Sequence, residues 1–409
     1  MTVPPVWIAL LLVLLWTAGC APAPTETRRN TSADAAGFTT RISVTHAQQF
    51  SVEYRGDLAV LRVSAPLISW SRPGDAEPRS ETIVLVPRGL DAPRLTDDLA
   101  GLPIVRVPAE RVATNAEADD AILTAIGAAD RLVAVGGVTT YDDAIRARVE
   151  SGALGQIGYT WHAPPNLEVL VSRRPELLLM RLVNLDQSDA LERVRAAGVP
   201  VVPSFQWAEP TYLGALEWVK LAGLLTGRER EATEYFDRVA ADAARMAAVG
   251  AARTTRPAVL WAYYGGGQRW FAYHKGVEES FIHDAGGRSA LASLAQPWRD
   301  GGTVLSTERL SELARDADVW IIGDTHAVTD TGGLDLPPAP VMQLFKPWRE
   351  GRLWHNYKRR KPAVNAFDWY ERHALRPDLV IADLLEIVHP GAVPGHELHF
   401  FDRFVPAGR

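Results

Sequence analysis

Aromatic and arginine side chains gather in the segments that follow the predicted strands of this 409-residue chain. Flat rings pack on large planar or apolar ligands, and arginine forks hold carboxylates or catecholates. Since ligands of open α/β sheets bind beyond the carboxyl ends of the strands, these side chains are candidates for a binding cleft, although several are equally well explained as core residues. The candidates are Tyr159, Trp161, His162, Arg181, Trp207, Tyr263, Tyr264, Arg269, Trp270, Trp298 and Trp369.

The ten histidines do not cluster at metal-ligand spacing. A bare zinc or manganese site needs several histidines and carboxylates around one ion. His162, His274 and His326 fall in candidate cleft segments, so direct metal binding is an alternative, but the sequence predicts no metal site and no cofactor. The basic run 358–361 either attracts an anionic ligand or is a solvated surface.

No pattern typical of a catalytic site occurs in the sequence. It has no Gly-x-Ser-x-Gly elbow, no His-Glu-x-x-His and no Gly-x-Gly-x-x-Gly after a predicted strand. The sequence therefore predicts no catalytic residues and a protein that binds rather than reacts. Acid–base pairs leave little trace in a sequence, so an exported α/β enzyme stays open as the alternative.

The N-terminus predicts export. An apolar run, Val6 to Trp16, precedes Thr17-Ala18-Gly19-Cys20, as in a signal peptide with small residues before its cleavage site. The run is short for a membrane span. Cys20 is the only cysteine and resembles the lipid-bearing residue of a bacterial lipobox; an ordinary signal peptide is the alternative. The expected location is extracytoplasmic, in the periplasm or at the cell surface, with acyl chains on Cys20 as the membrane anchor. The net charge of −6 gives no reason to expect nucleic-acid binding.

The remaining chain predicts an α/β protein of two lobes with mostly parallel sheets. Strand and helix patterns alternate from about Ile104 and again after Pro257. Between them a helix is expected from Pro210, as its first residue, to Thr226. The predicted parts are a signal peptide (1–20), a flexible tether (21–49), a β-meander extension (50–103), an N-terminal α/β lobe (104–208), the interlobe helix with the helix after it (209–249) and a C-terminal α/β lobe (250–409).

One theme occurs in both lobes. Glu168 and Glu308 each stand near the start of a short predicted helix, and each helix leads through an acidic residue into an apolar strand. A glutamate at this place is also favoured by the helix dipole alone. Two copies at matching places in two lobes indicate a shared role.

These segments, together with residues 121–135, 218–229 and 377–390, resemble the class III periplasmic substrate-binding proteins of ABC importers, the iron-siderophore/vitamin B12-binding family and its iron-complex-transport subgroup. The resemblance covers roughly Val105 to His389. It implies two α/β lobes joined by a single long helix, with a metal chelate held in the cleft between them. A ferric siderophore is the first expectation, and a corrinoid or haem is the alternative. It also implies that Glu168 and Glu308 dock onto arginines of the permease.

Overall fold

The computed structural model describes residues 38, 40–69, 76–91, 94–159, 163–294, 303–323 and 336–405. The predicted anchor Cys20 lies outside these ranges, as do three predicted cleft residues, Trp161, His162 and Trp298. Within the described ranges, no helix combines the length and the apolar character needed to cross a bilayer. Two large sheets and a four-stranded N-terminal sheet form the framework of the described chain.

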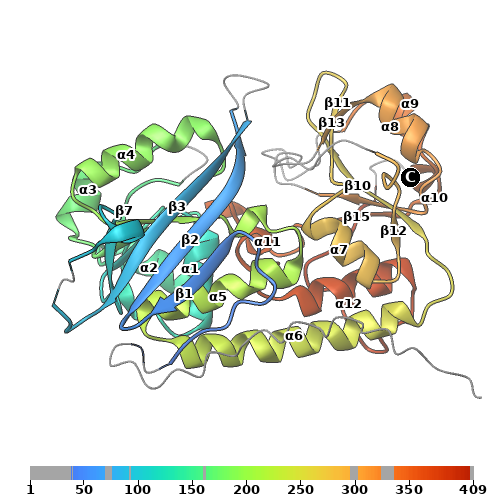
Figure 1. Cartoon of the computed structure of the whole chain (residues 1–409). Helices are drawn as coiled ribbons and strands as arrows, with labels where there is room; N and C mark the ends of the chain where they lie inside the picture. Colours follow the sequence, from blue (N-terminus) through green and yellow to red (C-terminus); the bar gives the residue numbers. More distant parts are fainter. Residues whose placement is uncertain are drawn as a thin grey trace, which may run out of the picture. The chain divides into compact units, whose positions relative to one another are not determined.

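The first α/β half is built on a five-stranded sheet with the order β7-β6-β5-β8-β9, in which every pairing is parallel. Because the chain winds outward from β5 in two directions, right-handed crossovers place α1 and α2 on one face and α3 and α4 on the other (Figure 1). The strands are β5 (Val112–Thr114), β6 (Leu132–Val135), β7 (Gly155–Gln156), β8 (Leu177–Arg181) and β9 (Val201–Ser204); the helices are α1 (Glu117–Ala125), α2 (Asp143–Glu150), α3 (Leu167–Ser172) and α4 (Ser188–Ala196).

The second half contains a mixed sheet with the order β13-β11-β10-β14-β15-β18, and β12 pairs with β10. Strands β10, β12, β14 and β15 are parallel, whereas β11, β13 and β18 are antiparallel to their neighbours. The strands are β10 (Ala258–Tyr264), β11 (Arg269–Ala272), β12 (Arg288–Ser289), β13 (Thr303–Ser306), β14 (Val319–Ile322), β15 (Leu353–His355) and β18 (Asp402–Arg403); the helices are α7 (Val277–Asp284), α8 (Thr307–Ala314), α9 (Ala339–Met342), α10 (Lys346–Glu350), α11 (Asp368–Arg372) and α12 (Pro377–Val388).

The N-terminal sheet has the order β1-β2-β3-β4. Its first three strands are antiparallel, which confirms the predicted meander, and β4 then runs parallel to β3. Strands β4 and β5 belong to different sheets, and Pro108, which has no backbone N–H to donate, stands between them. The strands are β1 (Phe50–Arg55), β2 (Leu58–Ile68), β3 (Ala76–Pro87) and β4 (Ile104–Val107).

Two helices connect the halves, α5 (Tyr212–Thr226) and α6 (Glu229–Ala251). The first turn of α5 adds Ala215 to the hydrophobic cluster of the second half, and from Leu216 onward the helix packs in the cluster of the first half. Helix α6 returns alongside and contributes Phe236 to the first cluster and Ala243 to the second. The predicted fold class, two α/β lobes joined by a long interlobe helix, is confirmed, and α6 shares the role of α5.

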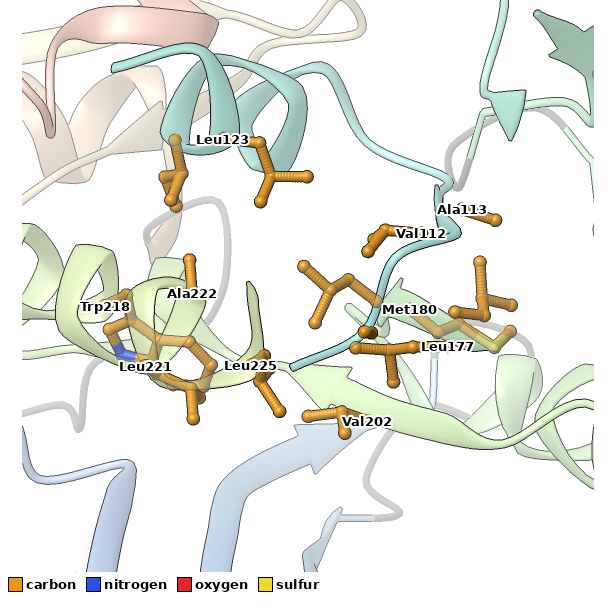
Figure 2. Packing of buried hydrophobic residues seen from close by; sticks show 14 of the residues in the cluster. Val112, Ala113, Leu123, Leu177, Met180, Val202, Trp218, Leu221, Ala222 and Leu225 are labelled. Carbon is orange, nitrogen blue, oxygen red and sulfur yellow. The ribbon is translucent and has the colours of Figure 1, made fainter. Parts of the chain in front are cut away.

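Helix α5 is buried on nearly all sides, which explains its apolar sequence. Figure 2 shows Trp218 of this helix in the same hydrophobic cluster as Leu177 of the first sheet. The helix starts two residues after Pro210, so the predicted start is wrong. Thr211 caps it, and its hydroxyl accepts the backbone N–H of Gly214 at 3.1 Å.

Candidate functional site

The first half has its topological switch point between β5 and β8, because the chain leaves β5 toward β6 on one side and β8 pairs on the other. A crevice is expected beyond the carboxyl ends of parallel strands at such a point. Arg181 ends β8, and Asn115 directly follows β5. The Arg181 backbone N–H donates to Asn115 Oδ1 at 2.8 Å, and Asn115 Nδ2 donates to the Arg181 carbonyl at 3.4 Å. The predicted cleft residue Arg181 is therefore fixed by a neighbour that the sequence did not single out.

Two buried carboxyl groups lie next to this point, on the first turn of α1. Asp119 Oδ1 accepts the Ser204 hydroxyl at 2.8 Å, and Asp120 Oδ1 accepts the Thr114 hydroxyl. The second oxygen of each carboxyl group is buried without a hydrogen-bond partner in the described chain. Burial raises the pKa of Asp119 to about 6, against the opposing charge of Arg181, and raises the pKa of Asp120 well above its ordinary value. These groups therefore hold a proton more readily than exposed carboxyl groups do.

The second half carries a row of rings on one face of its sheet. Because β10 pairs with β11, Tyr263 stands opposite Phe271 and Tyr264 opposite Trp270, so the two pairs point to opposite faces. The rings of Tyr263 and Phe271 stack with centroids 4.9 Å apart and planes 7° from parallel. Val304 of β13 pairs with Phe271 and is 51% exposed. An open aliphatic side chain beside stacked rings is suited to a planar or apolar ligand.

The other face of the same strands is core. Trp270 is fully buried, and its Nε1 donates to Thr307 Oγ1 at 3.0 Å. Tyr264 leans against Trp270 with centroids 5.2 Å apart. Arg269 stands two residues before Phe271 on β11, so it belongs to the ring face, and it is exposed. From the sequence these residues were expected on a loop, and Phe271 and Val304 were not among the predicted cleft residues. Only the strand pairing gives the alternation that separates the two faces.

Three further cleft candidates have partners in the structure. The ring of Tyr159 covers Gly136, where an added Cβ would lie 2.2 Å from the ring. Trp207 is half-buried, and its Nε1 donates to the Leu182 carbonyl at 2.8 Å. Trp369 is buried in the hydrophobic cluster of the second half. These contacts fix each of the three side chains within its own half of the protein.

Polar contacts between the two halves concentrate on residues 140–143, before and at the start of α2. The Tyr141 backbone N–H donates to Glu371 Oε1, and the Tyr141 carbonyl accepts from Lys361 Nζ at 2.8 Å. Lys361 also forms an ion pair of 2.6 Å with Asp143. The Tyr141 ring lies under three cations of the second half, at centroid distances of 4.5 Å for Lys361, 5.4 Å for Arg359 and 5.7 Å for Arg372.

The basic run 358–361 therefore makes contacts mainly with other residues of the protein. Arg359 forms an ion pair of 2.5 Å with the buried Asp368, and Lys358 Nζ donates to a backbone carbonyl. The sequence allowed two roles for this run, the attraction of an anion or a solvated surface. The structure shows instead that it contributes to the contact between the halves.

Glu371 is the buried acid of this junction. Burial is the main reason why its pKa is raised, to about 8, and the negative charge of Glu117 on α1 adds to the effect. The backbone N–H of Tyr141 and the charge of Arg372 oppose the shift. The two halves therefore meet through a carboxyl group that is protonated at neutral pH.

The two predicted docking glutamates have the same local geometry. Glu168 is the second residue of α3 and Glu308 the second residue of α8. Each helix is capped by the residue two positions earlier: Asn166 Oδ1 accepts from the third helical N–H at 3.1 Å, and Ser306 Oγ does so at 3.2 Å. Both glutamates are exposed, and neither forms an ion pair within the described residues.

A resident metal ion has no obvious place in the part of the chain that the structure describes. There, no group of three or more histidine, cysteine, aspartate or glutamate side chains is arranged to hold an ion. The pair of Asp119 and Asp120 is engaged with hydroxyl groups and does not add a third ligand.

Comparison with known proteins places this geometry in a family. The pattern of the family described as periplasmic binding protein matches residues 112–355, more than half of the chain. Two uncharacterized lipoproteins of Methanocaldococcus jannaschii are 23% identical over 313 residues (74% of this chain, 70% of the relative) and 24% identical over 339 residues (77% of each chain).

Two solved structures share the fold. A periplasmic haem-binding protein from Pseudomonas aeruginosa has a TM-score of 0.50 at 19% identity and covers 72% of this chain and 97% of its own. Helicobacter pylori CeuE with Ni(II) bound has a TM-score of 0.54 at 13% identity and covers 72% of this chain and 88% of its own. The chain belongs to the periplasmic binding protein family, as the resemblance in its sequence predicted.

Proposed function

We propose that the chain is the extracytoplasmic substrate-binding lipoprotein of an ABC importer and captures a metal chelate between its two α/β halves. The observation that carries this proposal is that one half has a polar switch point and the other has stacked rings bordered by an exposed valine. Arg181 and Asn115 stand at the first, and Tyr263, Phe271 and Val304 form the second. Arginine and amide groups orient polar or anionic substituents, and the rings pack on a flat or apolar body.

A ferric siderophore is the first expectation for the chelate, and a corrinoid or haem is the alternative. The fold relatives include a haem-binding protein and a protein with Ni(II) bound, which supports a metal-bearing ligand without selecting one. An exported enzyme is the less favoured function, because Asp119, Asp120 and the hydroxyl groups of Ser204 and Thr114 that donate to them are all buried, where a substrate does not reach them.

Delivery would use Glu168 and Glu308 as two separated anionic points on a basic permease surface, with the chain held near the membrane by acyl groups on Cys20. The matching helix-start geometry of the two glutamates supports this role. A stiff connection through α5 and α6 favours small lobe movements on capture.

The test is a tryptophan-fluorescence titration of the soluble chain from residue 21 with ferric siderophores, cobalamin and haem. The chain has thirteen tryptophans, so a coloured ligand in the cleft quenches strongly. Saturable quenching in the sub-micromolar range by one class identifies the cargo. No response to any of the three classes contradicts the chelate-binding proposal.

A further inference from the structure

Exposed apolar side chains accompany the two glutamates. Four large hydrophobic residues of the described chain are exposed: Val171, Val304, Leu344 and Val405. Val304 belongs to the ring face of the cleft, and Val405 lies at the end of the described chain. The other two each stand beside one glutamate. Val171 follows Glu168 by three residues, on the same side of α3, and Leu344 lines a hollow that also contains Glu308.

The hollow beside Glu308 has a volume of about 360 Å³ and is lined mainly by residues of α8 and by Val341 and Leu344, at and just after α9. Val341 and Leu344 give it an apolar side, and Glu308 and Glu312 give it an acidic side. Glu312 is already paired with Arg309 at 3.0 Å, whereas Glu308 has no ion pair within the described residues. The acidic side therefore offers one carboxylate that has no ion pair within the described residues next to an apolar surface.

Leu344 is held in its exposed position by its neighbours. Met342 and Phe345, on either side of it in sequence, are fully buried. Arg349 Nη1 donates to the carbonyls of Gln343 and Leu344 at 2.8 and 3.0 Å. The exposure of this leucine is thus a built feature of the turn after α9, and not the result of a loose segment.

We propose that the hollow beside Glu308 receives an apolar side chain of the permease, from a surface segment that also presents a cation to Glu308. This inference rests on the proposed importer function and specifies the chemistry of its docking contact. The two sides of the hollow determine which partner fits. An amphipathic segment packs an apolar side chain on the apolar residues and presents a cation to the carboxylate. Because the described part of the first half offers only Val171 beside Glu168, docking is asymmetric, and the second half makes the larger apolar contact.

The experiment measures association of the mature chain with the ABC permease–ATPase pair of the producing organism, reconstituted in lipid nanodiscs, by biolayer interferometry at several salt concentrations. The variants are Leu344→Gln, Glu308→Gln and Val171→Gln. The matched control is Val405→Gln, which removes an aliphatic side chain that is 67% exposed, against 48% for Leu344, and does not line the hollow. Thermal denaturation and the fluorescence titration verify that each variant is folded and binds its ligand.

The expected result is that Leu344→Gln weakens association about tenfold, through faster dissociation and at every salt concentration, as expected for the loss of one buried aliphatic side chain. Glu308→Gln slows association and flattens its salt dependence. Val171→Gln has a smaller effect than Leu344→Gln, and Val405→Gln has none.

Three results overturn the inference. If Leu344→Gln matches Val405→Gln while Glu308→Gln weakens association, docking is only electrostatic and the hollow is unused. If the wild-type chain self-associates and Leu344→Gln abolishes this, the occupant is a second copy. If the wild-type chain binds its ligand but does not associate with the permease, the delivery role itself fails, and the inference fails with it.

Discussion

Lys361 and Asp143 form an ion pair of 2.6 Å that joins the second α/β half to the start of α2 in the first. The same ammonium group donates to the Tyr141 carbonyl at 2.8 Å and lies 4.5 Å from the centre of the Tyr141 ring. One side chain therefore makes three contacts across the junction between the two halves. Because Asp143 is exposed, the ion pair alone contributes little, and the other two contacts supply most of the stabilisation.

Replacing this lysine tests the junction. Lys361→Met keeps the length of the side chain and removes the charge, so we expect a loss of about 1 kcal/mol in the free energy of unfolding. Amide hydrogen exchange at residues 140–143 should become faster. The control is Arg309→Met, which breaks an exposed ion pair of 3.0 Å inside α8 alone. Equal exchange at residues 140–143 in both variants would show that Lys361 does not hold the halves together.

The raised pKa of Glu371 predicts a specific pH dependence of stability. Between its ordinary pKa and about 8, the folded state holds a proton that the unfolded state has released. Folding therefore takes up a proton in this range, and stability falls as pH rises toward 8, by a few kcal/mol at most on the order-of-magnitude scale of such shifts. Glu371→Gln mimics the protonated group and should flatten this slope in urea denaturation at pH 5.5, 7 and 8.5. Glu168→Gln changes an exposed site and should keep this dependence of stability on pH. If Glu371→Gln keeps it as well, another group takes up the proton.

The fold could be predicted from the sequence because its strands and helices alternate with strong apolar patterns. The orientation of the side chains on the ring face could not be predicted. Phe271 and Val304 lie on the short strands β11 and β13, which have four residues each. The face to which their side chains point depends on the pairing of β10 with β11 and of β11 with β13. The junction through Tyr141 was also missed. Its partners stand more than two hundred positions away, and nothing local in the sequence marks them.

If the ring face binds the ligand, a substitution there should lower ligand affinity. Phe271→Ala removes the ring that stacks on Tyr263 and borders Val304. We expect ligand affinity to fall about tenfold, since a large apolar contact is lost, with a smaller effect on stability because Phe271 is only half-buried. The fluorescence titration measures this. Leu344→Ala, outside the cleft, is the control, and unchanged affinity in Phe271→Ala would remove this face from the ligand site.

Substitutions at Glu168 and Glu308 test whether ligand binding and delivery to the permease depend on different residues. Glu168→Ala combined with Glu308→Ala should leave ligand affinity unchanged, because both side chains are exposed on α3 and α8 and form no ion pair in the described chain. Uptake of radiolabelled ligand by cells that depend on this protein should be abolished. Glu350→Ala is a control at another exposed glutamate. Loss of ligand affinity in the double variant would refute the docking role.

The segment before β1 is attached to α5 by a buried carboxylate. Glu217 accepts the backbone N–H groups of Thr45, His46 and Ala47 at 3.0, 2.7 and 2.8 Å. It also accepts from the buried Lys220 at 2.8 Å. Although burial opposes it, these hydrogen bonds lower the pKa of Glu217 below its ordinary value. The chain that leads from the predicted anchor is thus fixed to the helix that connects both halves.

Breaking this attachment should be costly, because Lys220 would stay buried without its counter-charge. Glu217→Gln is expected to reduce the free energy of unfolding by about 3 kcal/mol, and hydrogen exchange at Thr45 to Ala47 should rise. In Glu217→Gln combined with Lys220→Met the uncompensated charge is absent, so the combined loss should be smaller than the sum of the two single losses. Urea denaturation of all four proteins gives this difference. Additive losses would mean that the two side chains do not depend on each other, and that the attachment is held by the backbone contacts of the segment alone.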